Sequence, residues 1–251
     1  MTHQDAAIES SANLEARRQS LLWRIGRKFA TVTEDVAVGS VLLRFTRVAD
    51  PNLVLDEMAA AEDLKDKLAG HRRPSEDLTL PYWAELWDSA YGVSDYLIST
   101  LFPNSALKGM NVLDLGCGMG LTGTVAAASG AKVTFADLSP EALLFARLNS
   151  APFAERVRTR QLNWRTAKLE ERFDLIIGAD ILYERAQWMY LEPFWRAHLK
   201  PGGTILLGEP GRATGEYFID WIAGWPWIMK QAAQKVPTRE KPIRLFILQE
   251  K

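Results

Sequence analysis

The 251-residue sequence has little of the chemistry that marks several large classes of protein. It contains one cysteine and three histidines, so a disulfide framework and a thiolate zinc cluster are excluded and a transition-metal site is not expected. Its apolar runs fall short of the roughly 20 residues that a membrane-spanning helix needs. Its start, "MTHQDAAIESSANLEARRQS", lacks the apolar stretch of a signal peptide. We therefore expect a soluble cytoplasmic protein that holds no metal and enters no membrane.

A dominant charge is missing as well. The 30 lysines and arginines balance 31 aspartates and glutamates, which leaves a formal net charge of -1. Nucleic-acid binding relies on a net or clustered positive surface that neutralises phosphates, so we expect no nucleic-acid partner. What the chain does have is 47% hydrophobic residues, which is enough at this length for a full core.

Residues 1–80 predict an N-terminal extension, an accessory layer on the domain that follows. In chain order we expect a polar start without regular structure over 1–13, a basic amphipathic helix over 14–29, a hairpin over 36–48 and a helix over 53–69. The basic helix is indicated by Leu21, Ile25 and Phe29, which fall four residues apart. Gly70 is expected to end the last helix. A linker, "HRRPSEDLTLP", comes next.

Residues 81–251 have a different texture, in which apolar, β-branched segments alternate with segments compatible with helices. The candidate strands are "NVLDL", "AKVTFAD", "VRTRQLN", "FDLIIGAD", "GTILLGE" and "IRLFILQ". Between two of them, "SPEALLFARLNS" offers Ser139 as a helix N-cap and Pro140 at the first helical position. Strand alternating with helix predicts an α/β domain whose parallel sheet is covered by helices on both faces.

The segment "NVLDLGCGMGLTG", residues 111–123, contains two overlapping glycine motifs. From Gly118 it is G-x-G-x-x-G, the dinucleotide fingerprint, and from Asp114 it is D-x-G-x-G-x-G, typical of a loop that binds S-adenosylmethionine. Open α/β sheets bind ligands beyond the carboxyl ends of their strands, and glycine lets the backbone approach a ligand there. Asp137, at the end of the next strand, is placed to accept both hydroxyls of a ribose. Since both cofactors contain adenosine, this acid does not decide between them.

Three other features favour S-adenosylmethionine. Asp114 lies inside the end of the strand, where its charge would repel a pyrophosphate and attract a sulfonium and an α-amino group. A dinucleotide fingerprint usually opens its domain, whereas here about a hundred residues precede it. The third strand runs into Asn163 and Trp164, an amide that can bond to adenine edges and an indole that can stack on the adenine face. Packing in the core is an equally weighted alternative for Trp164.

Four stretches in this order, "VLDLGCGMG", "VTFADLSPEAL", "LNW" and "FDLIIGADILYE", resemble a class I S-adenosylmethionine-dependent methyltransferase. "PYWAELWDSAYGVSDYLI" and the D-x-x-Y of "GADILY" further resemble the protein lysine methyltransferases of methyltransferase family 16. "LLGEPGR" is similar to the "DPGR" stretch of the electron transfer flavoprotein β-subunit lysine methyltransferases, with Glu209 in place of the aspartate. The resemblance implies a Rossmann-like, seven-stranded, mostly parallel sheet flanked by helices over 81–251, with S-adenosyl-L-methionine as cofactor.

The resemblance also implies a set of residues that bind the cofactor. These are Trp87 over the methionine end, Asp114, Gly116, Cys117 and Gly118 as its cradle, Asp137 at the ribose, Leu138 beside the adenine, Asn163 and Trp164 along the adenine pocket, and Ala179 at the end of the fourth strand.

Asp180 and Tyr183, the D-x-x-Y pair, are the predicted catalytic residues. A carboxylate near the methyl group can orient a lysine ammonium and help to remove its proton, because only the free amine can attack. The alternative is that Asp180 caps a helix beginning near Glu184 or Arg185. The ring of Tyr183 could hold a cation over its face, or the residue could belong to the core.

Several neighbours of these residues also have two interpretations. Tyr82, Trp83 and Trp87 could complete an aromatic wall, or they could pack against the helix that follows. Glu209 is a candidate second carboxylate for a lysine, or a cap for its loop. Cys117 needs only to be small, because a catalytic thiol would require a base and no histidine is close in sequence.

Together these features predict an S-adenosylmethionine-dependent N-methyltransferase that modifies a lysine side chain of a protein. A small-molecule N-methyltransferase acting on a nicotinamide-like or other amine is the alternative. A catalytically silent binding protein of the same fold is a third hypothesis, against which the intact Asp114, Asp137 and Asp180 argue.

Overall fold

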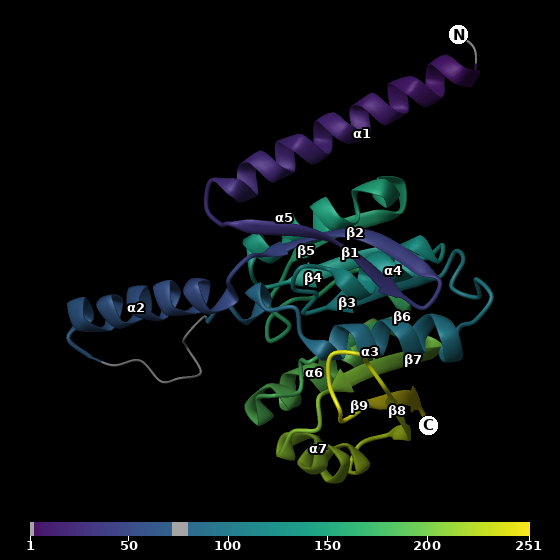
Figure 1. The fold of residues 1–251 in the computed structure, drawn as a ribbon. Helices are drawn as coiled ribbons and strands as arrows, with labels where there is room; N and C mark the ends of the chain where they lie inside the picture. Colours follow the sequence, from purple (N-terminus) through teal and green to yellow (C-terminus); the bar gives the residue numbers. More distant parts are fainter. Residues whose placement is uncertain (1–2, 72–79) are drawn as a thin grey trace.

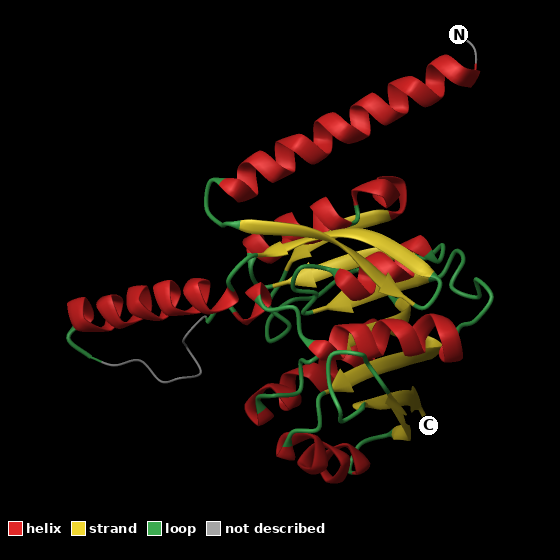
Figure 2. Cartoon of the chain, viewed as in Figure 1, coloured by secondary structure: helices red, strands yellow, loops and turns green. Residues whose placement is uncertain are grey.

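The central element of the computed structural model, which describes residues 3–71 and 80–251, is a seven-stranded sheet (Figures 1 and 2). Its strands are β3 (Asn111–Leu115), β4 (Lys132–Asp137), β5 (Val157–Gln161), β6 (Phe173–Ala179), β7 (Leu199–Glu209), β8 (Trp227–Gln234) and β9 (Ile243–Glu250). They lie in the order β5-β4-β3-β6-β7-β9-β8. β9 pairs antiparallel with β7 and β8, and the other pairs are parallel. The predicted Rossmann-like, mostly parallel sheet is thus confirmed.

Helices cover both faces of this sheet, as its continuous apolar strands require. They are α3 (Asp88–Tyr96), α4 (Leu121–Ala128), α5 (Pro140–Asn149), α6 (Arg185–His198) and α7 (Ala213–Ala223), with short turns η2 (Tyr82–Ala84), η3 (Leu97–Leu101) and η4 (Ala151–Arg156). Apolar side chains of α3, α4 and α5 share one core with one face of the strands. Those of α6 and α7 share a second core with the other face.

The N-terminal residues add a hairpin and two long helices. These are α1 (His3–Gly26), β1 (Thr31–Val38), β2 (Val41–Val48) and α2 (Pro51–Ala69), and both helices project from the body (Figure 1). Gly70 adopts the left-handed conformation that ends α2, as predicted. The expected unstructured start is wrong from His3 onward, because the helix begins there and not at Leu14. Alanine, glutamine and glutamate in this stretch are good helix formers.

The hairpin is joined to the sheet domain by a third apolar core and by buried hydrogen bonds. Ile25 and Phe45 pack in one cluster with Met119 and Phe145. Asn149, at the end of α5, accepts a hydrogen bond from the Thr46 amide and donates to the carbonyls of Thr46 and Met119. The N-terminal layer therefore braces the loop between β3 and α4. Most of the predicted linker, residues 72–79, lies outside the described residues.

The strand order fixes where a ligand can enter. From β3 the chain winds outward through β4 to β5, then returns to β6 on the other side of β3. Such a reversal leaves a crevice beyond the carboxyl ends of β3 and β6.

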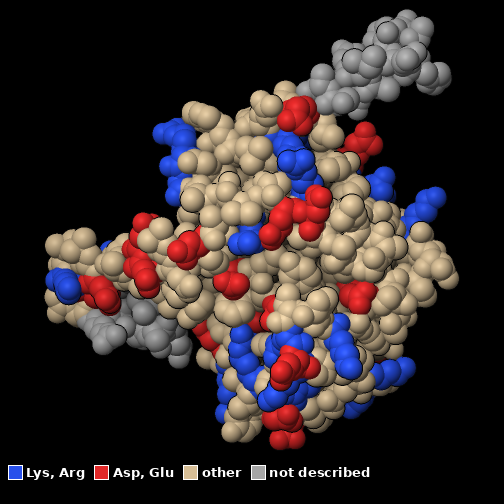
Figure 3. Space-filling model, in the orientation of Figure 1, with Lys and Arg blue, Asp and Glu red and all other residues tan. Residues whose placement is uncertain are grey.

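On the face shown in Figure 3, acidic and basic side chains are interspersed over the body. Within the two described ranges, every helix is too short or too polar to cross a bilayer.

Candidate active site

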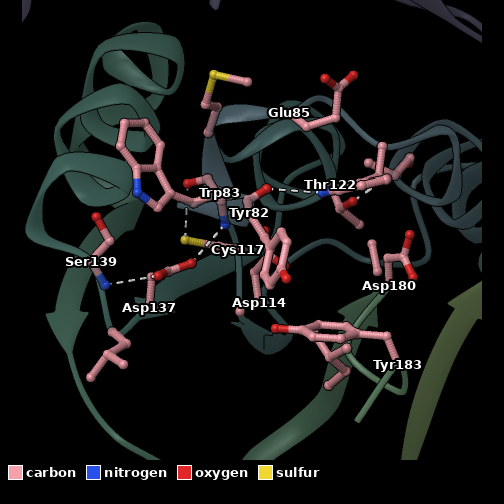
Figure 4. A pocket seen from close by; sticks show the side chains of 18 of the residues that line it. Tyr82, Trp83, Glu85, Asp114, Cys117, Thr122, Asp137, Ser139, Asp180 and Tyr183 are labelled. Atoms are coloured by element: carbon pink, nitrogen blue, oxygen red, sulfur yellow. Dashed lines mark hydrogen bonds between the residues drawn. The ribbon is translucent and has the colours of Figure 1, made fainter. Parts of the chain in front are cut away.

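A cavity of about 590 Å³ lies at the carboxyl ends of β3, β4 and β6. Its lining includes all twelve residues that the sequence singles out for cofactor binding or catalysis, which are Trp87, Asp114, Gly116, Cys117, Gly118, Asp137, Leu138, Asn163, Trp164, Ala179, Asp180 and Tyr183. Figure 4 shows Asp137 and Ser139 at one side of this pocket and Asp180 with Tyr183 at the other. A volume of this size is typical of small-molecule sites.

The glycine loop is shaped by backbone conformations that other residues adopt rarely. Gly116 and Gly118 have φ values of 66° and 51°, in the left-handed region that favours glycine. A Cβ atom on Gly116 would also lie 2.7 Å from Cγ2 of Ile181. A side chain at Gly116 would therefore clash with Ile181.

Asp137 ends β4 and organises two backbone amides. Its Oδ2 accepts a hydrogen bond from the Gly118 amide and its Oδ1 one from the Ser139 amide, each at 2.9 Å. Burial raises the pKa of this carboxyl, and the backbone hydrogen bonds oppose the shift. Since each carboxylate oxygen has two lone pairs, both can still accept a hydroxyl donor from the cavity.

Asp114 differs from the simple negative charge expected from the sequence. Its side chain is buried, and its Oδ2 accepts a hydrogen bond of 2.8 Å from the Gly123 amide at the start of α4. Burial raises the pKa of Asp114 to about 7, helped by the nearby charge of Asp137. The carboxyl is therefore only partly ionised at neutral pH, and a cation beside it would favour the ionised form.

Cys117 lines the cavity as a protonated thiol. Burial raises the pKa of its thiol well above the ordinary value, and the charges of Asp137 and Asp114 act in the same direction. A thiol without a stabilised thiolate is a poor nucleophile, so the interpretation of Cys117 as a small residue in a tight turn holds.

Gln187, for which the sequence predicts no role, supports the side of the cavity that is predicted to bind adenine. Trp164 is half-buried and packs against the core, while its Nε1 donates to Oε1 of Gln187 on α6 at 3.0 Å. Nε of Arg165 donates to the same oxygen at 3.1 Å. Oδ1 of Asn163 accepts from the Arg165 amide at 2.9 Å. Trp164 thus serves the core and the cavity wall together.

Asp180 is a buried carboxylate in an unusual backbone conformation. Its φ is 61°, which is uncommon for a residue other than glycine and is tolerated only where the surroundings support it. Its amide donates to the Gly208 carbonyl at 2.8 Å, which links the ends of β6 and β7. The helix-cap interpretation is wrong, because α6 begins at Arg185 and its N-cap Glu184 makes no side-chain cap.

Arg212 holds the Asp180 carboxylate by two hydrogen bonds, Nη1 to Oδ1 and, at 3.1 Å, Nη2 to Oδ2. Burial raises the pKa of Asp180, while the hydrogen bonds and charge of Arg212 lower it. The guanidinium also lies 5.5 Å from the centre of the Trp87 ring. Arg212 ends the "EPGR" stretch, and the sequence alone predicts no role for this arginine.

Glu209 acts on the loop that presents Arg212. Its Oε2 accepts hydrogen bonds of 2.8 Å from the amides of Gly211 and Arg212, and its Oε1 pairs with Nε of Arg244 at 2.6 Å. Glu209 is absent from the cavity lining. Of its two interpretations, loop capping is correct and the second carboxylate is wrong.

Three aromatic side chains form the mouth of the cavity on the Asp180 side. Tyr82 and Tyr183 meet edge to face at 5.5 Å, and Nε1 of Trp87 donates to the Tyr82 carbonyl at 2.9 Å. Tyr183 is 38% exposed, so the core alternative is wrong for this residue. Burial raises the pKa of its hydroxyl well above the ordinary value, which keeps it a hydrogen-bond donor. Trp83 mainly packs against Phe29 and Phe145.

These groups fit an adenosyl ligand with a cationic methionine end. Two acids, one turn of glycine backbone and a half-buried indole surround a single cavity. Because the pKa of Asp114 is raised to about 7, a positive charge bound beside this carboxyl would stabilise its ionised form. Within the described residues, no cluster of three metal-ligating side chains is found.

The strand order of the sheet is that of the Rossmann-like methyltransferase fold. A putative RNA methyltransferase from Pyrococcus horikoshii is similar with a TM-score of 0.53 and 17% identity, over 78% of this chain and 98% of that chain. At this identity the likeness concerns the fold.

The sequence comparison is more specific. The chain belongs to the lysine methyltransferase family, whose profile matches residues 76–222. It is 35% identical over 135 residues to EEF1A lysine methyltransferase 3 of Mus musculus, which is 52% of this chain and 56% of that protein. It is 34% identical over 143 residues to the electron transfer flavoprotein beta subunit lysine methyltransferase of Mus musculus, with 53% and 51% covered. The chain spans about half the length of these curated relatives.

Proposed function

We propose that this protein is an S-adenosylmethionine-dependent N-methyltransferase that modifies a lysine side chain of a protein. The observation that carries the proposal is the junction of two parts in one cavity, the glycine loop with its acids and the Asp180–Tyr183 rim. Membership of the lysine methyltransferase family supports the choice of nucleophile. The two relatives named above carry protein lysine methyltransferase activity in their names.

The cofactor would be held mainly by backbone and carboxylates of this chain. Asp137 would accept the ribose hydroxyls, Gly116 and Gly118 would let the backbone approach, and Asp114 would face the cationic end. Trp164 and Leu138 would enclose the adenine. When bound, S-adenosylmethionine supplies a methyl group on a cationic sulfur, whose carbon–sulfur bond breaks as the new nitrogen–carbon bond forms.

The other side of the cavity would receive the lysine. The rings of Tyr82, Trp87 and Tyr183 would line its methylene stem and exclude water, which favours reaction by alignment and desolvation. Asp180 would orient the ammonium toward the methyl group and accept the proton that nitrogen must lose. These roles for Asp180 and Tyr183 are the catalytic part of the proposal.

The proposal extends to the division of the chain into domains and to the location of the protein. Residues 1–80 would act as an accessory layer and 81–251 as the methyltransferase domain, in agreement with the hairpin that braces the glycine loop through Asn149. A cytoplasmic location would suit a protein that modifies other proteins there.

Labelled methyl transfer tests the function. Purified protein would be incubated with S-adenosylmethionine carrying a labelled methyl group and a native lysate of its source cell, and labelled proteins would be separated and digested. We expect label on lysine residues of protein. Transfer to small amines with none to protein would contradict the proposal and support the small-molecule alternative.

A further inference from the structure

The carboxylate proposed to receive the substrate is covered in this structure. The side chain of Asp180 is 3% exposed, whereas that of Arg212 is 35% exposed. Both oxygens of Asp180 are engaged by the guanidinium. The more exposed member of this pair, which an incoming lysine meets first, is therefore a cation.

The backbone of Arg212 is held firmly, so its guanidinium can leave Asp180 only by rotation of the side chain. Oε2 of Glu209 fixes the Gly211 and Arg212 amides. Nη2 of Arg239 donates to the Pro210 carbonyl at 2.7 Å. A released guanidinium would thus remain at the cavity mouth, beside the Trp87 ring.

If a lysine ammonium displaced Arg212 from Asp180 and brought no acidic group with it, the Arg212 guanidinium would be left at the cavity mouth without an ion-pair partner. In the described part of the chain, the ion pair of Arg212 is with Asp180. Glu209, on the same loop, already pairs with Arg244 and with two amides. Glu85 and Glu184 also line the cavity, and neither forms an ion pair with Arg212. Removing one partner of a partly buried charge pair is costly, because the remaining charge stays partly desolvated.

We propose that the target lysine is accompanied in the folded substrate by an acidic side chain, which takes over Arg212 while the lysine takes Asp180. This inference rests on the proposed function. The exchange keeps two ion pairs at the rim in place of one, and no charge is left without a partner. A lysine whose neighbours are neutral lacks this compensation and enters poorly. Arg212, which binds the acidic side chain of the substrate, is therefore a specificity-determining residue.

The test begins with wild-type protein, labelled S-adenosylmethionine and the lysate, followed by mass spectrometry to locate the methylated lysine. The labelled protein is then produced with the nearest Asp or Glu changed to the corresponding amide. Values of kcat/KM are measured for both forms with wild-type enzyme, R212Q and R212K. R185Q is the matched control, because Arg185 is an exposed arginine near the rim that contacts Tyr217 and Trp188 but not Asp180.

We expect the amide substrate to lose about tenfold or more in kcat/KM with wild-type enzyme and with R185Q. With R212Q the two substrates should differ by less than about threefold, since the acid no longer has a partner. R212K keeps the charge but not the bidentate geometry, and should retain part of the preference.

Three results would overturn the inference while leaving the proposed function intact. They are a methylated lysine without an acid beside it, equal rates for acid and amide substrates with wild-type enzyme, and the same preference in R212Q as in wild type. A wild-type protein that labels no lysine would instead contradict the proposed function, and this inference with it.

Discussion

The two sides of the cavity hold their carboxylates in different ways. On the β3–β4 side, the oxygens of Asp114 and Asp137 accept hydrogen bonds from backbone amides of Gly123, Gly118 and Ser139. On the β6–β7 side, Asp180 is held by the side chain of Arg212. The first arrangement is fixed by the course of the chain, whereas the second can open by rotation of one side chain.

This difference suits two kinds of ligand. A cofactor of constant shape gains from groups that are already positioned, since no ordering cost is added on binding. A substrate that enters and leaves in each cycle gains from a partner that can be exchanged. We therefore expect changes on the β3–β4 side to act on cofactor affinity, and changes on the β6–β7 side to act on turnover.

The largest effect is expected from D180N, which should reduce turnover while leaving cofactor affinity nearly unchanged. D180N keeps the shape of the side chain but removes the charge that orients the ammonium and accepts its proton. We expect kcat to fall by about 10²- to 10⁴-fold, while the Kd for S-adenosylmethionine from isothermal titration stays within about threefold. Unchanged turnover would remove Asp180 from the mechanism, and an equal loss of cofactor affinity would contradict the division between the two sides.

On the backbone-held side, D137A should weaken cofactor binding. The variant loses the proposed ribose acceptor and leaves the amides of Gly118 and Ser139 without their partner. Hydrogen bonds to a charged group contribute about 1.5 to 3 kcal/mol, so we expect the Kd for S-adenosylmethionine to rise by about 10- to 100-fold. D220A, which removes an exposed carboxylate on α7, is the control and should bind as wild type. A D137A protein with wild-type Kd would show that the ribose lies elsewhere.

The stability of the protein should also depend on pH. The pKa of Asp114 is raised from 3.8 to about 7, so the folded chain binds this proton more tightly than the unfolded chain. The free energy of unfolding should therefore fall as pH rises from about 4 to 7, by up to about 1.4 kcal/mol per unit. D114N should have a shallower slope in urea denaturation of the ligand-free protein. Asp137 and Asp180, whose pKa values are also raised, keep part of the slope.

The same titration should appear in cofactor binding. A cationic ligand favours the ionised Asp114, so affinity for S-adenosylmethionine should rise with pH up to about 7 and then level off. An affinity that falls over this range would show that the positive end of the ligand does not face Asp114.

The sequence predicted one side of this site far better than the other, for a physical reason. Glycines at Gly116 and Gly118 and the acid at Asp137 form a local pattern, because a left-handed backbone and a strand end are properties of short segments. The pairing of Asp180 with Arg212 joins residues 32 positions apart. It depends on the register of β6 against β7 and on the loop held by Glu209, which no short motif specifies.

The effect of burial on ionisation is the other property that the sequence did not predict. The sequence predicts a negative charge at Asp114, whereas burial raises the pKa of this carboxyl to about 7. Likewise, the apolar spacing predicts a helix from Leu14, whereas the polar residues from His3 onward are helical as well.

The smallest predicted effect concerns Gln187, a side chain that supports the cofactor side of the cavity. Oε1 of Gln187 accepts from Trp164 and from Arg165, and Q187A would remove this acceptor without touching the glycine loop. Because such hydrogen bonds contribute about 0.5 to 1.5 kcal/mol, the Kd for S-adenosylmethionine should rise by only about two- to tenfold, with kcat nearly unchanged. Q19A, on the exposed surface of α1, is the control. A loss as large as that of D137A would mean that side chains hold the adenine as firmly as the backbone holds the ribose.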